Sequence, residues 1–111
     1  MASESAKGSA VFLYTSVPKD VTTEMAQRAM LDVLMARGVR VVRVDGADAA
    51  NKDVRAALWA VSGRRAVYPQ LFVRAADGGA HEFVGDSEAF TMLVENNEAR
   101  KGLDALVART T

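Results

Sequence analysis

Few residues of this chain could support catalysis, because cysteine is absent and histidine occurs once. The 111 residues contain no cysteine and a single histidine, His81. Without a thiol the chain has no disulfide bond, no thiolate metal ligand and no thiol nucleophile. One histidine without a cluster of carboxylates does not make a zinc site. Thiol–disulfide exchange is therefore excluded, and we expect neither a metal centre nor another cofactor.

The remaining candidates are side chains that could hold a ligand rather than react with one. Arg64 and Arg65 form the only dense basic group, and a guanidinium can bind a carboxylate through two hydrogen bonds. The alternative is a solvated loop. Asp86 and Ser87 stand where a helix should begin, so they either bind a ligand there or serve only as caps. The hydroxyls of residues 16–23 have no histidine base near them in sequence, so we expect no enzyme with another nucleophile.

The overall charge gives no sign of a polyanionic partner. Lys and Arg together number 14, as do Asp and Glu, so the net charge is zero. Nucleic acids and anionic membranes are bound by an excess of clustered basic residues. No apolar run approaches the roughly 20 residues that span a bilayer, and the chain does not begin like a secretion signal. We expect a cytoplasmic monomer that binds neither nucleic acid nor membranes.

Short strands and amphipathic helices must position these candidates. Residues 1–9 are small, polar and without period, which predicts a flexible tail before a single domain at 10–111. Apolar runs and turn residues predict strands at 10–15, 39–45, 70–74 and 80–84, and helices at 22–37, 54–62, from 87 onward and around 103–107. Thr22 or Thr23 is the expected cap of the first helix, and Asn96-Asn97 the expected break after the third.

This order is a βαβ unit followed by a helix, a β-hairpin and helices. A parallel strand pair joined to an antiparallel hairpin, with helices on both faces, makes a four-stranded mixed sheet in an α/β/α sandwich. The predicted fold class is therefore three-layer α/β, and the architecture resembles the thioredoxin fold.

The first helix should pack on the sheet through one broad apolar face. Its members recur at helical spacing: Met25, Ala26, Ala29, Met30, Val33 and Ala36. Leu31 and Met35 are four residues apart and should point away from the sheet. Trp59 lies off the apolar stripe of the second helix, so it either packs at the flank or contacts a partner. Leu31, Met35 and Trp59 thus form either peripheral packing or a protein-binding patch.

Two segments carry a resemblance to glutaredoxins. Residues 62–73 resemble the stretch that leads into the third strand, with Pro69 at the position of a cis-proline. Val84, Gly85 and Asp86 resemble the turn that caps the next helix and holds one end of glutathione. Where glutaredoxins carry Cys-Pro-x-Cys, residues 16–23 are longer and thiol-free. The resemblance implies a vestigial glutathione-type groove made of Lys19, Arg65, Tyr68, Pro69, Gly85, Asp86 and Ser87.

A second resemblance spans residues 10–107 and is carried by 68–72, 85–90 and 95–97. These stretches are similar to the SH3-binding glutamic-acid-rich protein family, whose members are glutaredoxin-like domains that have lost the redox cysteines. The chain departs from that family near Pro69, because no second proline completes a PxxP motif for an SH3 domain. The resemblance implies a non-catalytic protein-interaction or adaptor module. The alternative is a small-molecule binder that holds a glutathione-like ligand in the vestigial groove.

Overall fold

The computed structural model describes residues 8–96 and 100–110. Every predicted strand and helix is present. The strands are β1 (Ser9–Tyr14), β2 (Val41–Asp45), β3 (Gln70–Arg74) and β4 (His81–Asp86). The helices are α1 (Val21–Ala36), α2 (Lys52–Ser62), α3 (Ser87–Glu95) and α4 (Arg100–Thr110), and the short 3-10 helix η2 (Ala49–Asn51) precedes α2. Most of the predicted tail and Asn97 of the predicted break lie outside the described residues, although Ser9 already belongs to β1.

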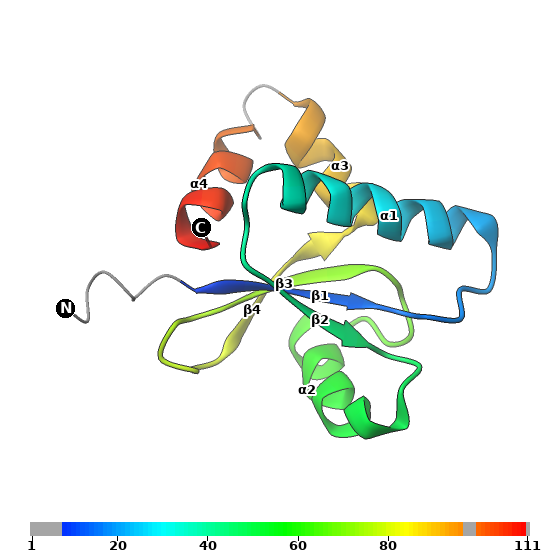
Figure 1. The fold of residues 1–111 in the computed structure, drawn as a ribbon. Coiled ribbons are helices and arrows are strands. Elements are labelled where there is room, and N and C mark those ends of the chain that lie inside the picture. Colours follow the sequence, from blue (N-terminus) through cyan, green and yellow to red (C-terminus); the bar gives the residue numbers. More distant parts are fainter. Residues whose placement is uncertain (1–7, 97–99, 111) are drawn as a thin grey trace.

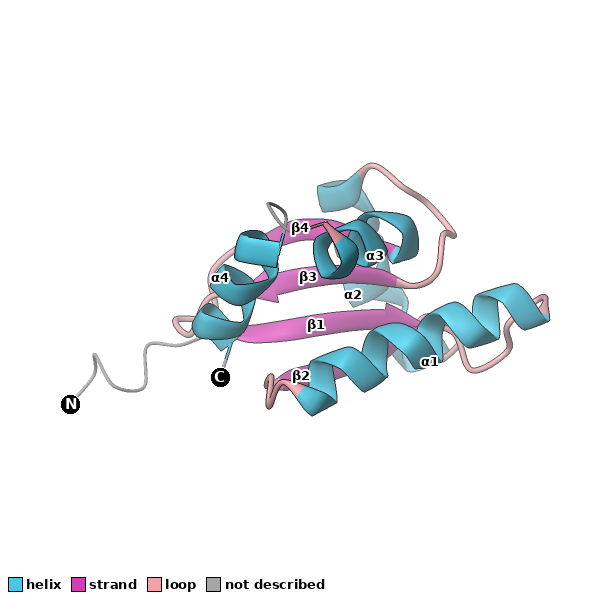
Figure 2. Ribbon diagram, turned by 90° about the horizontal axis from the view of Figure 1, so that it is seen from above, coloured by secondary structure: helices cyan, strands magenta, loops and turns pink. Residues whose placement is uncertain are grey.

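The sheet has the order β2-β1-β3-β4, with β1 parallel to β2 and antiparallel to β3. The β3–β4 hairpin is antiparallel and contains a register shift between Leu71 and Phe72. Helices α1, α3 and α4 cover one face of the sheet and α2 covers the other, as Figures 1 and 2 show. The predicted three-layer α/β/α sandwich with a mixed four-stranded sheet is confirmed.

The core has two layers because side chains alternate across β1. Ala10 and Phe12 face α1, α3 and α4, whereas Val11 and Leu13 face α2. All four are buried, as a continuous apolar run on a strand covered on both faces predicts. The strand β2 starts two residues later than predicted, because the amide of Arg40 donates to the carbonyl of Thr110 in α4 instead of extending the strand.

Asp20 is the N-cap of α1, which corrects the prediction of Thr22 or Thr23. Asp20 has an extended backbone, and its carboxylate accepts a hydrogen bond of 2.8 Å from the amide of Thr23. This is the usual geometry of an N-cap, with the carboxylate at the positive end of the helix dipole. The hydrogen bonds from Thr23 hold the pKa of Asp20 below the ordinary value of 3.8.

The buried face of α1 is rotated from the predicted one. Its buried residues are Gln27, Met30 and Leu34, whereas Met25 is 64% exposed. The apolar pattern does not include Gln27, although this amide is buried and bonded to the neighbouring loop. Leu31 is half-buried against the core below α1, so the prediction that it points away is wrong.

Replacing two adjacent residues of α1 tests this face. Leu34 is completely buried and Met35 is 56% exposed. Leu34→Ala should lower the free energy of unfolding by about 2–5 kcal/mol because it leaves a cavity. Met35→Ala should change it by less than about 0.5 kcal/mol. Urea unfolding followed by circular dichroism measures both, and equal losses would contradict the orientation of α1.

The titration of Asp20 gives a second test. Because its pKa is lower in the folded chain, its contribution to stability is present above pH 3.8 and is lost as the pH falls through the lower folded value. Asn also caps helices but does not titrate. Asp20→Asn should therefore show a smaller loss of unfolding free energy between neutral and acidic pH than the parent chain. Parallel pH profiles would rule out a lowered pKa at Asp20.

Candidate functional site

An open groove lies at the end of β1, between the loop that enters α1 and the loop that enters β3. Its volume is about 270 Å³. The first wall belongs to the thiol-free junction at 16–23, and the second precedes the cis peptide bond between Tyr68 and Pro69. The lining residues are Thr15, Val17, Lys19, Thr23, Ala66, Val67 and Tyr68.

Gln27 fixes the first wall from α1. Its Oε1 accepts a hydrogen bond of 2.8 Å from the Thr15 amide, and its Nε2 donates to the Thr15 carbonyl at 3.1 Å. The side chain thus completes both backbone hydrogen bonds of a residue just beyond β1. Asp45 holds the next residue, because its carboxylate accepts from the amide of Ser16 at 2.9 Å. Burial favours a higher pKa for Asp45, but hydrogen bonds from Ser16 and Ala47 outweigh it and lower the pKa below 3.8.

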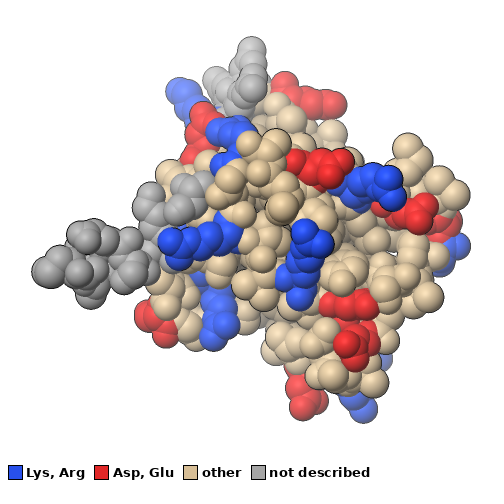
Figure 3. All heavy atoms as spheres, viewed as in Figure 1, with Lys and Arg blue, Asp and Glu red and all other residues tan. Residues whose placement is uncertain are grey.

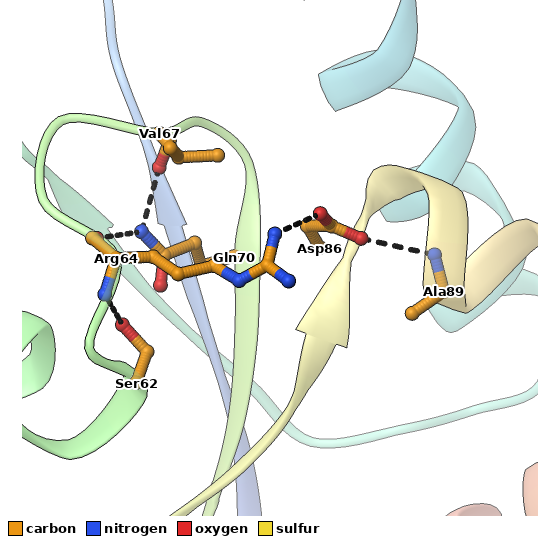
Figure 4. Close-up of polar contacts among 6 residues, drawn as sticks. All are labelled: Ser62, Arg64, Val67, Gln70, Asp86 and Ala89. Atoms are coloured by element: carbon orange, nitrogen blue, oxygen red, sulfur yellow. Dashed lines mark hydrogen bonds and ion pairs between the residues drawn. The ribbon is translucent and has the colours of Figure 1, made fainter.

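Gln70 fixes the second wall from β3. The residue is fully buried, and its Nε2 donates to the carbonyls of Arg64 at 2.7 Å and Val67 at 2.8 Å (Figure 4). These two bonds enclose Ala66, whose φ of 61° is a left-handed conformation that costs a non-glycine residue about 1 kcal/mol. The side-chain amide of Gln70 therefore stabilises the left-handed conformation of Ala66 in this loop.

Asp86 lies at the N-terminus of α3, as predicted, and its carboxylate is fully engaged. One oxygen accepts from the Ala89 amide at 3.0 Å, which caps α3. The other accepts from Nη1 of Arg64 at 2.8 Å (Figure 4). A ligand amine bound to this carboxylate would compete with Arg64 for it.

The structure separates the residues of the predicted glutathione-type groove. Lys19 and Tyr68 line the groove, and Pro69 is buried behind it after the predicted cis bond. Arg65 does not join them, because its guanidinium carbon lies over the Trp59 ring at 5.8 Å from the centroid.

Two more residues of the predicted groove, Gly85 and Ser87, lie elsewhere around the start of α3. A Cβ on Gly85 would lie 2.7 Å from that of Ala89, so the glycine allows α3 to approach the strand. Ser87 lines a different hollow, between α1 and α3, and its carbonyl accepts from the hydroxyl of Thr91 at 2.9 Å. Neither Gly85 nor Ser87 is part of the groove lining.

The predicted partner-binding residues do not form one patch. Leu31 and Met35 belong to α1, whereas Trp59 belongs to α2 on the opposite face of the sheet (Figure 1). Trp59 packs at the flank of the core on that side and contacts Tyr68, with ring centroids 6.4 Å apart. Met35 alone of the three is exposed.

Sequence reasoning missed both glutamines, the engagement of Asp86 by Arg64, and the valines of the groove. Val17 is 72% exposed and Val67 is 38% exposed, although both are apolar. Gln27 sits one residue off the apolar stripe and Gln70 opens a strand, so neither pattern marks them as buried hydrogen-bonding groups. Two valines in otherwise polar loops are the sequence signal that could have indicated this groove.

The groove lining combines apolar, hydroxyl and cationic side chains, and it does not include the histidine of the chain. The single histidine lies in the β3–β4 hairpin, and partial burial together with the charge of Arg74 lowers the pKa of His81. Among residues 8–96 and 100–110 no three His, Cys, Asp or Glu gather as a metal site. No helix in the same ranges is long and apolar enough to cross a membrane. Acidic and basic side chains are interspersed over the face seen in Figure 3.

Comparisons with known proteins agree on the fold. No family model and no curated protein matches the sequence. The structure is similar to a wheat glutaredoxin, at 15% identity and a TM-score of 0.62, covering 98% of this chain and 88% of the other. It is also similar to a buckwheat glutaredoxin–glutathione complex, at 12% identity and a TM-score of 0.61, covering 94% and 83%. This chain therefore has a glutaredoxin-like thioredoxin fold, without the cysteine that thiol chemistry requires.

Replacing each glutamine tests its hold on one wall of the groove. Gln70→Leu should lower the free energy of unfolding by about 1–3 kcal/mol, because the carbonyls of Arg64 and Val67 lose their donor. Amide hydrogen exchange should become faster in residues 64–68 and stay unchanged at Thr15. Gln27→Leu should instead make amide exchange faster at Thr15 and leave residues 64–68 unchanged. The same exchange pattern in both variants would show that the glutamines do not act locally.

Proposed function

We propose that this chain is a non-catalytic binding module that holds an extended peptide segment of a partner protein in the groove beside Tyr68. The single observation that carries the proposal is the groove itself. It is open, it lies where the redox centre of a glutaredoxin would be, and it presents exposed apolar side chains and one cation instead of a thiol. We further propose that the module acts in the cytoplasm as a monomer.

The backbone beside the groove favours an extended ligand. Pairing between β1 and β3 ends at Leu13 and Gln70, so Tyr68 lies beyond the last paired residues. Tyr68 also lines the groove, so an extended segment bound there could add main-chain hydrogen bonds beside the sheet as an extra strand does. Buried Pro69 and the Gln70 hydrogen bonds hold this backbone in place before any ligand binds, which lowers the entropy cost of binding.

The side chains of the groove suit a short apolar segment that ends in a carboxylate. Val17 and Val67 offer exposed apolar surface on the two walls, and burying it under a ligand is favourable. Lys19 adds a positive charge on the first wall. The resemblance to the SH3-binding glutamic-acid-rich proteins supports the same reading, because those glutaredoxin-like domains also lack redox cysteines. The missing PxxP motif leaves SH3 domains outside the proposal.

A glutathione-like small molecule is the second candidate. The buckwheat protein of similar fold is a complex with glutathione, which is itself a peptide. Lys19 and Tyr68 stand in the groove as the resemblance implies. The engagement of Asp86 by Arg64 works against this candidate, because the carboxylate expected to meet the ligand amine is already paired. Arg65, the other expected ligand contact, lies at Trp59 instead.

Selection from a library of short peptides, followed by amide NMR of the selected complex, tests the proposal. The signals of Val17, Lys19 and Tyr68 should shift on binding. Val17→Asp should weaken the binding by about tenfold or more, because it places a charge in the apolar contact. Val42→Asp is the matched control, since Val42 is also an exposed valine but lies on β2 outside the groove.

Glutathione separates the two candidates in the same NMR experiment. Shifts at Lys19 and Tyr68 with millimolar glutathione, and stronger binding by Arg64→Ala, would support the small-molecule candidate. Selected peptides that bind the parent chain and Val17→Asp equally would contradict the proposed groove.

A further inference from the structure

A second hollow lies on α2, on the opposite face of the sheet from α1 (Figure 1). Its volume is about 470 Å³. Gly63 caps α2 with a left-handed φ of 70°, and this turn leads the chain to Arg65 at the rim. We call it the α2 hollow, and its lining residues are Lys52, Arg55, Ala56, Trp59, Ala60, Gly63 and Arg65.

The lining places three cations together without an anion. Lys52 and Arg55 are three residues apart on α2 and therefore share one side of the helix. Arg65 joins them from the loop after α2. None of the ion pairs recorded within residues 8–96 and 100–110 includes any of the three. The acidic residue of the same helical turn, Asp53, is not part of the lining. Three like charges in one hollow attract an anion.

The aromatic ring of Trp59 organises two of these cations. The guanidinium carbon of Arg55 lies 4.9 Å from the ring centroid and that of Arg65 lies 5.8 Å from it. Such cation–π contacts favour a guanidinium over the face of the indole ring. Nη1 of Arg55 also donates to the carbonyl of Gly46 at 2.7 Å. The guanidinium is also hydrogen-bonded to the side chain of Tyr68, so Arg55 is held in place on α2.

Two N–H groups of the same residues lack an acceptor. Nε of Arg55 and Nε1 of Trp59 are both buried and have no hydrogen-bond partner in the part of the chain that the structure describes. A buried donor without an acceptor is destabilising, because it has lost its hydrogen bond to water and gained none in the protein. An oxyanion that enters beside Arg65, a surface side chain that can swing aside, would supply the missing acceptor.

We propose that the α2 hollow binds the phosphate group of a phosphorylated small molecule. A phosphate offers several acceptor oxygens and up to two negative charges, and the planar guanidinium of arginine matches it through paired hydrogen bonds. The hollow is larger than one phosphate and falls within the size range of small-molecule sites, so it also has room for the organic part of the ligand. The α2 hollow shares no lining residue with the peptide groove, and this inference does not depend on the proposed function.

Trp59 is the only tryptophan, and its ring lines the α2 hollow, so its fluorescence responds to a ligand bound there. The ring also contacts Tyr68 of the groove, so the variants of Lys52 and Arg65 are needed to assign a change to the hollow. The full chain is titrated with inorganic phosphate and with pyrophosphate, at an ionic strength held constant with sodium chloride. We expect a saturable change, with tighter binding of pyrophosphate because it carries more charge. Lys52→Gln and Arg65→Gln should each weaken the binding by about tenfold. Lys101→Gln, an exposed lysine on α4, is the matched control and should bind like the parent chain.

Vesicles of phosphatidylcholine with and without phosphatidylinositol 4-phosphate identify the source of the phosphate. Binding to pyrophosphate but not to these vesicles supports a free small molecule, as proposed. If the chain sediments with the vesicles that contain phosphatidylinositol 4-phosphate and does not bind pyrophosphate, the ligand is a lipid headgroup and the proposed free small molecule is wrong. A fluorescence change that sodium chloride reproduces, or equal binding by Lys52→Gln, Arg65→Gln and the parent chain, would overturn the site. Circular dichroism confirms that each variant is folded.

Discussion

The groove depends on buried glutamine side chains that act where the sheet can no longer pair the backbone. β1 and β3 stop pairing at Leu13 and Gln70, and the chain on each side then turns away. Gln70 donates to two carbonyls of one loop, and Gln27 bonds both main-chain groups of Thr15 in the other. A buried amide can replace backbone partners because it carries both a donor and an acceptor. The two loops that line the groove are therefore fixed to the folded core by buried side chains.

Other residues of the chain stabilise the positions that surround the thiolate in a glutaredoxin. In glutaredoxins the junction before the first helix carries a thiolate that the helix N-terminus stabilises. Here Asp20 supplies the negative charge at that helix terminus and caps α1. Arg64 and Asp86 join the second loop to α3 by an ion pair. Each element that would serve a redox centre has a structural partner within the chain, so the groove is held in shape without a cysteine.

The sequence predicts the elements and the layers well, because apolar periodicity and turn residues are local signals. The buried run of β1, the cap at Asp86 and the cis bond before Pro69 are confirmed. The site is predicted only in part, because long-range pairing decides it. Arg65 turns towards Trp59 and Leu31 packs on the core, and neither outcome follows from spacing along the chain. The burial of Gln27 does not follow from local spacing either, because its partner Thr15 is twelve residues away in the sequence.

The central claim is that the surface between the two glutamine-held loops is a peptide-binding groove. A crystal structure of the chain with a peptide selected for binding tests it most directly. The account predicts an extended peptide in contact with Val17 and Val67, with main-chain hydrogen bonds to Tyr68 and both glutamine contacts unchanged. A peptide bound as a helix between α1 and α3, or seated in the α2 hollow with the groove empty, would contradict it.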